Sequence, residues 1–176
     1  MQDAIPIDLA AKIRAIPDFP KPGILFRDIM PLLQDAQALR AAVDRMAEWS
    51  IGRHVDVVLG AESRGFILGS ALAYALNAGF VCARKPGKLP YATVSESYEL
   101  EYGSDALEVH EDAVTPGMNV LVHDDLLATG GTASAKVRLV KKMGGKVVGA
   151  TFLIELADLH GRDKLGGVDV FTLITY

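Results

Sequence analysis

The chain has 176 residues, half of them hydrophobic and under a quarter charged, which fits one domain with a sizeable buried core. This composition excludes a disordered tail and a fibrous protein, and no apolar run is long enough to cross a bilayer. The formal net charge of -4 gives no electrostatic reason to expect nucleic-acid binding. No secretory signal is visible at the N-terminus, and the single Cys82 cannot form an internal disulfide, so we expect a cytoplasmic protein.

The N-terminal part of the chain predicts two helices separated by a stiff loop. Apolar residues recur at helical spacing from Leu9 to Ile16, and Pro17 would end this first helix. Residues 18–23 include two prolines and a glycine, and they predict a rigid irregular stretch leading into residues 24–29. The apolar face of the second helix consists of Leu39, Val43, Met46 and Ala47.

Strands and helices alternate in the rest of the chain. Apolar, β-branched runs predict strands at residues 55–59, 80–83, 119–123, 147–154 and 170–174. One helix follows the first of these strands, with Ile67, Ala71, Ala75 and Leu76 on its core face. Another follows the third strand, with Ala133, Val137, Val140 and Met143 on its inner face. We therefore expect an α/β fold, a mostly parallel twisted sheet flanked by helices, in a single domain over residues 1–176.

Residues 84–105 interrupt this alternation with a mixture of Pro, Gly, Ser, Glu and Tyr that has no clear period. An irregular stretch of this length in a compact domain is usually functional or disordered, and we expect a flexible lid here. Leu107 and Val109 alternate with polar neighbours after it, which predicts a half-exposed strand.

The most informative segment runs from Val120 to Thr132, where a strand leads into Asp124 and Asp125 and then into a small Thr/Gly loop that opens a helix. A helix N-terminus offers unpaired N–H groups and partial positive charge, so this loop predicts a phosphate site. It is not a P-loop, which needs Lys at the start of the helix, and no Gly-x-Gly-x-x-Gly occurs in the chain. Adjacent carboxylates suit the hydroxyls of a sugar phosphate or a magnesium ion.

This segment closely resembles the hallmark of the type I phosphoribosyltransferases, a hydrophobic strand, two acids and a Thr-Gly-Gly-Thr-like loop. His123 departs from that pattern, because an aliphatic residue is expected there, and we assign it no role. The resemblance implies that the 5′-phosphate and ribose of phosphoribosyl pyrophosphate bind to Asp124, Asp125, Ala128, Thr129, Gly130, Gly131 and Thr132.

Five further segments, in family order, resemble the adenine phosphoribosyltransferase branch of that family. They cover residues 18–29, 62–66, 84–90, 98–103 and 159–165. The resemblance implies transfer of the phosphoribosyl group to adenine, giving AMP and pyrophosphate. Within residues 1–34, a base-binding segment, it places adenine against Leu25, Phe26 and Arg27, with Leu156 over the base. An aromatic ring such as Phe26 can stack on a flat heterocycle.

The resemblance also assigns the leaving group and the proton transfer. Arg64, Arg84, Lys85, Lys88 and Tyr102 would hold the phosphoribosyl pyrophosphate. Within the lid, Glu101 would act as a general acid–base near N7 of adenine. Mg²⁺ would be bound through the substrate, with no certain protein ligand, and the protein would be a homodimer. Arg84 would act in its own or the neighbouring site.

Three alternatives remain open at this point. Ser63 lies between a strand and a helix and loosely mimics the nucleophile of a serine hydrolase, with Asp124 or Asp125 and His160 as partners. A regulator on the same fold would sense the sugar phosphate without catalysis, although the chain has no appended DNA-binding segment. Within the enzymes, the runner-up is a transferase for hypoxanthine, guanine or xanthine.

Overall fold

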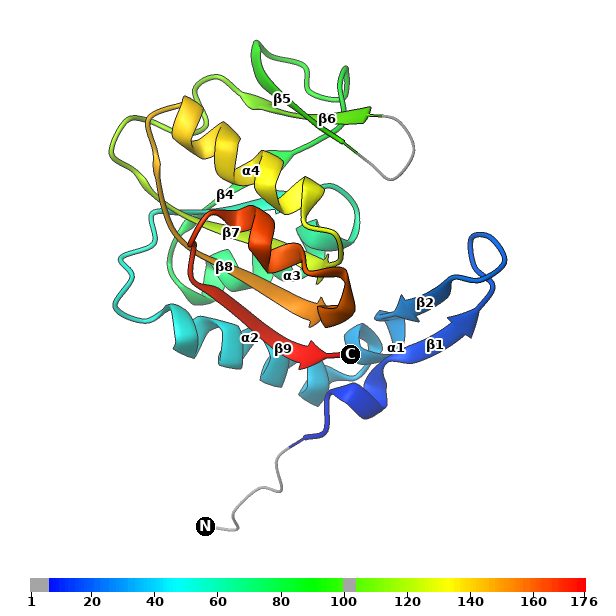
Figure 1. Cartoon of the computed structure of the whole chain (residues 1–176). Coiled ribbons are helices and arrows are strands. Elements are labelled where there is room, and N and C mark those ends of the chain that lie inside the picture. The colour runs from blue at the N-terminus through cyan, green and yellow to red at the C-terminus, as the bar shows by residue number, and fades with distance from the viewer. Residues whose placement is uncertain (1–6, 100–103) are drawn as a thin grey trace, which may run out of the picture.

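A five-stranded parallel sheet forms the centre of the molecule, in a computed structural model that describes residues 7–99 and 104–176 (Figure 1). In sheet order its strands are β4 (Gly79–Ala83), β3 (Val57–Ala61), β7 (Asn119–Leu127), β8 (Lys146–Glu155) and β9 (Val170–Thr175). Every residue of β3 is buried, as expected for a strand covered on both faces. The parallel α/β sheet predicted from the apolar runs is therefore confirmed.

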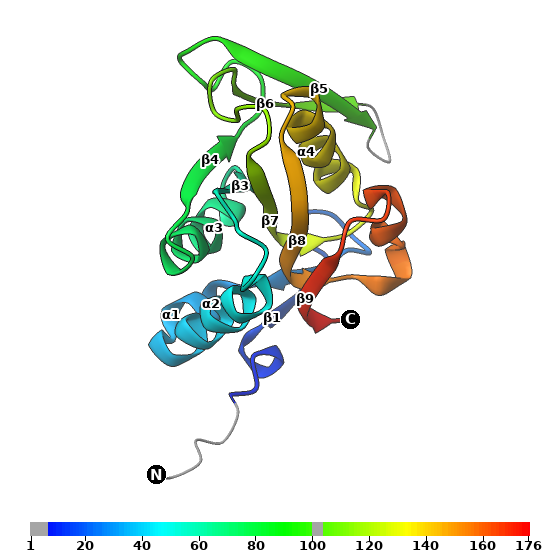
Figure 2. The same ribbon diagram turned by 90° about the vertical axis from the view of Figure 1, so that its left-hand side faces the viewer.

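Helices cover both faces of this sheet. Figure 2 shows α2 (Ala36–Ser50) and α3 (Arg64–Ala75) on one face and α4 (Gly131–Lys142) on the other. The predicted inner face of α4 is confirmed, whereas α3 turns Leu68 and Leu72 inward and leaves Ile67 43% exposed. Within the described ranges, no helix combines the length and hydrophobicity needed to span a membrane.

The strand order places the site. From β3 the chain passes through α3 to β4 on one side of the sheet, while β7, β8 and β9 extend it on the other side. The connections therefore diverge between β3 and β7. In open α/β sheets, ligands bind in the crevice beyond the carboxyl ends of the strands at such a switch point.

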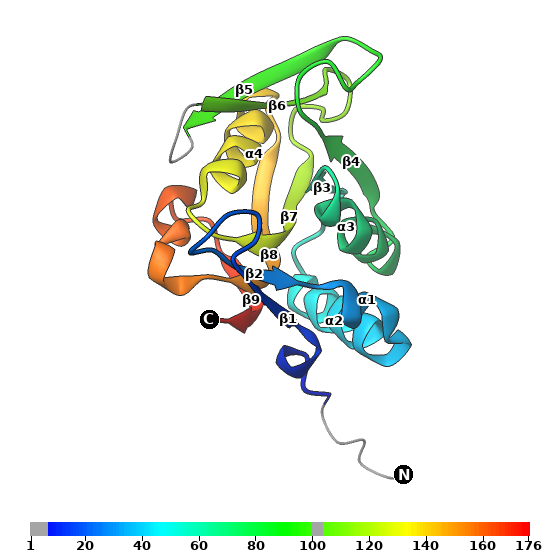
Figure 3. The same cartoon turned by 90° about the vertical axis from the view of Figure 1, so that its right-hand side faces the viewer.

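The N-terminal segment differs from the helix predicted for Leu9 to Ile16. Only a 3₁₀ turn, η1 (Ala10–Lys12), forms there, and β1 (Arg14–Pro17) follows and pairs antiparallel with β2 (Leu25–Asp28). Short helices are marginal in water, and strand pairing satisfies the backbone of these residues instead. A five-residue helix, α1 (Met30–Gln34), leads on to α2. Figure 3 shows the β1–β2 pair lying beside the ends of β8 and β9.

The segment predicted to be irregular over residues 84–105 is irregular from residue 84 to residue 92, but it becomes a strand after that. Its second half forms β5 (Thr93–Glu99), which pairs antiparallel with β6 (Ser104–His110), the strand predicted around Leu107 and Val109. The alternation of apolar and polar residues that predicts a strand is broken in β5, because the charged Glu96 lies on the same inward side as Val94 and Tyr98. Its carboxylate is 2.7 Å from Arg138 Nε of α4, so the sheet face accepts a charge.

Candidate active site

A pocket of about 240 Å³ opens at the carboxyl end of β7, where the switch point predicts a ligand site. Its lining consists of Arg64, Asp124, Asp125, Leu126, Leu127, Ala128, Thr129, Gly130, Gly131, Thr132 and Ala133. The structure thus brings every residue predicted for the 5′-phosphate and ribose into one cavity. Arg64, the first residue of α3, enters it from the end of the neighbouring strand β3.

The turn before α4 is shaped to leave backbone N–H groups free. Gly130 has the left-handed φ of 79° as N-cap, and no side chain caps the helix, so the first-turn N–H groups remain open to the pocket. A Cβ on Gly131 would lie 3.2 Å from the ring of Tyr98, and one on Gly130 would collide with Gly161. The turn therefore offers donors and partial positive charge to an anion.

Asp124 is held by Lys136, which is not among the site residues predicted from the sequence. Lys136 Nζ lies 2.8 Å from Asp124 Oδ2 and 2.6 Å from the carbonyl oxygen of His123, and the lysine side chain is fully buried. Burial opposes ionisation of Asp124, but the charge and hydrogen bond of Lys136 outweigh it and lower the pKa. Asp124 Oδ1 accepts from the Asp125 N–H at 3.0 Å, so both of its oxygens have partners inside the protein.

Asp125 is in the opposite electrostatic situation. Its Oδ2 lies 3.0 Å from Arg64 Nε, within ion-pair distance, yet the geometry gives that buried oxygen no hydrogen bond. Burial raises the pKa of Asp125 to about 7, with the charge of Asp124 adding to the effect and that of Arg64 opposing it. Asp125 is therefore the acid that faces the pocket with unused hydrogen-bonding capacity.

His123, to which no role was assigned, is fully buried behind the two acids. Its Nδ1 lies 3.1 Å from Thr151 Oγ1 of β8, and its Nε2 has no partner. Burial lowers the pKa of His123 to about 4, so the imidazole is neutral at ordinary pH. It fills the space beneath Gly69 of α3, where a Cβ would approach the ring to 3.1 Å.

The basic residues predicted for pyrophosphate lie around the β3–α3 connection, with only Arg64 in the pocket itself. Arg64 follows Ser63, whose φ of 68° is strained for a residue with a side chain. Arg84 Nε pairs with Glu62 at 3.1 Å, and Lys85 Nζ pairs with Asp105 at 3.0 Å. The fourth predicted residue of this group, Lys88, is exposed.

The residues predicted for the base lie next to the same edge of the sheet. The guanidinium of Arg64 is 4.9 Å from the ring centroid of Phe26, which joins the β1–β2 pair to the pocket. Arg27 stacks over Tyr176 at 3.6 Å, and the Tyr176 carbonyl accepts from the N–H of Ala157, the neighbour of Leu156. Leu25 is 48% exposed and therefore open to a ligand.

Two residues of this region were not found from the sequence. Tyr98, 9% exposed, packs on Gly131, and although burial raises its pKa, a hydrogen bond to Thr132 opposes that shift. It lay in the segment predicted to be irregular. Lys136 carried a usable signal, because it follows Ala133 by three residues and so falls on the apolar face of α4. The predicted Glu101 and Tyr102 lie outside the described residues.

Metal binding by the protein alone finds no support in the described part of the chain, since no three His, Cys, Asp or Glu side chains gather within it. One oxygen of Asp125 lies at ion-pair distance from Arg64 but has no hydrogen-bond partner, so the pocket offers one carboxylate to a cation. This donor set fits a hard cation that receives most of its oxygens from a bound phosphate compound.

Comparisons with known proteins agree with this geometry. Residues 32–174 match the family model described as "Phosphoribosyl transferase domain". The adenine phosphoribosyltransferase of Thermotoga maritima is 58% identical, over 97% of this chain and 98% of that relative.

Solved structures agree as well. The adenine phosphoribosyltransferase of Thermoanaerobacter pseudethanolicus is 51% identical with a TM-score of 0.93, over 96% of this chain and 98% of that one. The enzyme of Saccharomyces cerevisiae, solved with adenine and an imino-altritol bisphosphate, is 40% identical with a TM-score of 0.88, over 94% and 96%. With matches of this extent in sequence and in structure, the chain belongs to the adenine phosphoribosyltransferase family.

Proposed function

We propose that the protein transfers the phosphoribosyl group of phosphoribosyl pyrophosphate to adenine, giving AMP and pyrophosphate. The observation that carries this proposal is the pocket at the switch point. It contains an anion-binding turn (Thr129 to Thr132), the carboxylate of Asp125 with one oxygen that has no hydrogen bond, and Arg64. An anion site, a hydroxyl acceptor and a cation in this order match the 5′-phosphate, ribose and pyrophosphate of one donor molecule. Family membership removes the serine hydrolase alternative.

The sugar phosphate is held at two places in this scheme. The first-turn N–H groups of α4 and the hydroxyls of Thr129 and Thr132 bind the 5′-phosphate. Asp125 accepts from the ribose hydroxyls through the oxygen that has no hydrogen-bond partner, and Asp124 is held in place beside it by Lys136. Such fixed contacts lower the barrier by orienting the reacting carbon.

The leaving pyrophosphate binds to the basic residues that lie around the β3–α3 connection. Arg64, Arg84 and Lys85 each pair with a carboxylate of the protein, namely Asp125, Glu62 and Asp105. An anion of higher charge competes for these cations, and Lys88 and Tyr102 complete its site. The bond from C1 to the pyrophosphate oxygen then breaks as N9 of adenine attacks C1 from the other face, with inversion.

Adenine lies between Phe26 and Leu156, with the backbone of Leu25 and Arg27 along its edge. The stacking of Arg27 on Tyr176 turns that side chain away from the base edge and leaves its backbone to make the contact. The segment over residues 84–105 closes over the sugar and excludes water. Glu101 within it accepts the N7 proton of adenine as N9 bonds to C1, so the base does not retain a positive charge.

Mg²⁺ fits the pocket as a companion of the substrate. Asp125 offers one oxygen without a hydrogen-bond partner, and pyrophosphate and ribose oxygens would supply the remaining ligands. When bound, the ion would supply positive charge that offsets the charge of the leaving group.

The protein acts as a cytoplasmic homodimer in this proposal. Ile67 and Tyr74, seven residues apart on α3, are 43% and 90% exposed and share one side of the helix, which suits burial against a second copy. The free thiol of Cys82 suits a reducing compartment. A light-scattering mass of one chain would contradict the dimer.

A panel of four bases tests the proposed reaction. The protein is mixed with phosphoribosyl pyrophosphate, Mg²⁺ and adenine, hypoxanthine, guanine or xanthine, and pyrophosphate release is followed. Adenine alone should react well. Faster turnover of a 6-oxopurine would favour the alternative transferase, and donor binding without turnover of any base would favour a ligand-sensing regulator.

A further inference from the structure

The segment between β8 and β9 lies against the back of the phosphate-binding turn. Gly161, buried in this segment, approaches the turn so closely that a Cβ on it would collide with the Ala128 carbonyl oxygen and lie 3.1 Å from Gly130 N. A Cβ on Gly130 would in turn lie 3.0 Å from the Gly161 Cα. The two backbones touch with no room for a methyl group, so the position of Gly161 limits the position of the turn.

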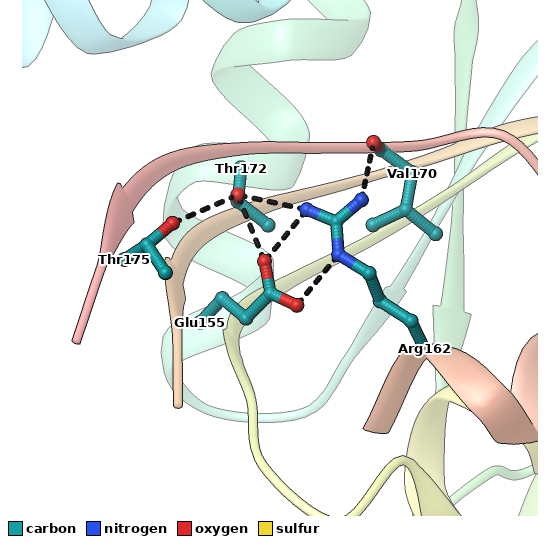
Figure 4. A network of polar contacts seen from close by, with 5 residues as sticks. All are labelled: Glu155, Arg162, Val170, Thr172 and Thr175. Carbon is teal, nitrogen blue, oxygen red and sulfur yellow. Dashed lines mark hydrogen bonds and ion pairs between the residues drawn. The ribbon is translucent and has the colours of Figure 1, made fainter. Parts of the chain in front are cut away.

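The next residue, Arg162, ties this segment to the sheet (Figure 4). Its Nε and Nη2 each lie 2.6 Å from one oxygen of Glu155, the last residue of β8, in a bidentate pair. Nη1 donates to the Val170 carbonyl at 3.1 Å, and Nη2 donates to Thr172 Oγ1 at 3.1 Å. Thr172 Oγ1 donates to Glu155 at 3.0 Å and closes the network across β8 and β9.

In this arrangement, the buried carboxylate of Glu155 depends on Arg162 for its counter-charge. The Glu155 side chain is only 7% exposed, and its pKa is lowered, first by the hydrogen bonds of Arg162. Without the guanidinium, a buried carboxylate would lack its counter-charge, and it would either draw in water or shift the end of β8. Either response would displace the segment that begins at Leu156 and carries Gly161.

We propose that Arg162 is a positioning residue for the 5′-phosphate site, because its clamp on Glu155 holds Gly161 against Ala128 and Gly130. The N–H groups of the turn then keep the spacing that a phosphate requires. This inference rests on the proposed function of the turn. The hydrogen bonds of the Arg162 side chain go to Glu155, Val170 and Thr172, none of which lines the pocket. Small misplacements matter at such sites, where about 1 Å can cost on the order of a hundredfold in rate.

Arg53 provides a matched control for this role. It also joins the β8 and β9 region, donating to the Val148 carbonyl at 2.9 Å and pairing with Asp169 at 3.2 Å. These contacts lie at the start of β8 and just before β9, at the opposite end of the strands from the pocket. Loss of Arg53 therefore reports the cost of losing an arginine clamp that has no connection to the phosphate turn.

The test compares Arg162→Gln and Arg53→Gln in the full-length protein. Calorimetric titration with ribose 5-phosphate measures the phosphate site without adenine, and steady-state assays give KM for the donor and for adenine. Arg162→Gln should weaken ribose 5-phosphate binding and raise the donor KM by on the order of tenfold or more, with a smaller change in the adenine KM. Arg53→Gln should leave these constants within about twofold of the original.

Two milder variants keep the test decisive if Arg162→Gln folds poorly. Arg162→Lys retains a charge for Glu155 but not the bidentate geometry, and it should recover part of the affinity. Thr172→Val removes one contact of the network and should weaken ribose 5-phosphate binding in the same direction by a smaller factor.

The outcomes separate this inference from the proposed function. Unchanged ribose 5-phosphate binding in Arg162→Gln, or in both milder variants if that one does not fold, would overturn the positioning role. Equal weakening by Arg53→Gln would overturn it as well. Failure of the unmutated protein to bind ribose 5-phosphate would instead contradict the proposed function.

Discussion

Lys136 Nζ and Asp124 Oδ2 form a 2.8 Å ion pair in the interior, and the lysine side chain has no exposed surface. The pair joins the inner face of α4 to the end of β7, directly behind the pocket. A buried pair of charges is stable only while both members are present. The position of an acid in the candidate ribose site therefore depends on a lysine that is fully buried behind it.

Substitution of Lys136 by Met should destabilise the protein strongly. The variant leaves the buried Asp124 without its counter-charge, and loss of one partner of such a pair costs about 3–5 kcal/mol. Urea unfolding followed by circular dichroism measures the change. Lys141→Met, on the same helix but exposed, should stay within about 0.5 kcal/mol of the original. Equal stability of Lys136→Met and the unmutated protein would contradict the inferred role of the pair.

The raised pKa of Asp125, about 7, predicts an unusual dependence of stability on pH. Between about pH 4 and 7 the unfolded chain loses the Asp125 proton while the folded protein keeps it, so this residue reduces stability as pH rises. Asp125→Asn removes the effect. Its stability relative to the unmutated protein should therefore increase from pH 4 to pH 7 and then level off, as measured by urea unfolding. A constant difference across this range would show that Asp125 ionises normally.

His123 should remain neutral at pH values well below those at which a histidine usually takes up a proton, since burial lowers its pKa to about 4. The unfolded chain takes up this proton near pH 6.5 and the folded protein does not, so His123 reduces stability as pH falls from about 6.5 to 4. Nuclear magnetic resonance measures this directly. The imidazole signal that disappears in His123→Val should not shift between pH 8 and pH 5, and a midpoint near 6.5 would contradict the buried, neutral state.

Alanine substitution at Gly130 should weaken phosphate binding because of the contact between Gly130 and Gly161, and a second glycine, Gly52, provides the control. Gly130 and Gly52 have nearly equal left-handed angles, φ 79° and 81°, so alanine is similarly strained at both. Only at Gly130 would the new methyl group collide with Gly161, because nothing lies within 4 Å of the equivalent position at Gly52. Gly130→Ala should lose ribose 5-phosphate affinity by about tenfold or more in calorimetry, and Gly52→Ala should retain it. Similar affinities in the two variants would contradict the fit of the turn against Gly161.

The strands of the main sheet could be predicted because each is a short apolar run, and the inner strand β3 is buried along its whole length. The N-terminal β1–β2 pair and β5 could not, because their structure depends on partners elsewhere in the chain. Ile13 and Ile16 fit a helical period, yet Arg14 to Pro17 pair with Leu25 to Asp28. The end of β7 was also misjudged, since the strand continues through both aspartates to Leu127.

The candidate site was predictable where chemistry lies in one contiguous motif, as in residues 120–132. Contacts between segments that are far apart in the chain could not be predicted from the spacing of residues in the sequence. The approach of Arg64 to Asp125 follows from the strand order, and the contact of Gly161 with Gly130 follows from a connection that has no periodic signal. Lys136 was recognisable as a charge on an apolar helix face, but its partner was not.

A crystal structure with bound phosphoribosyl pyrophosphate tests the central claim most directly. The 5′-phosphate should lie within hydrogen-bond distance of the N–H groups of Gly130, Gly131 and Thr132, with a ribose hydroxyl on Asp125 and the pyrophosphate displacing Asp125 from Arg64. Donor density elsewhere on the molecule, with the turn before α4 bare, would contradict the account.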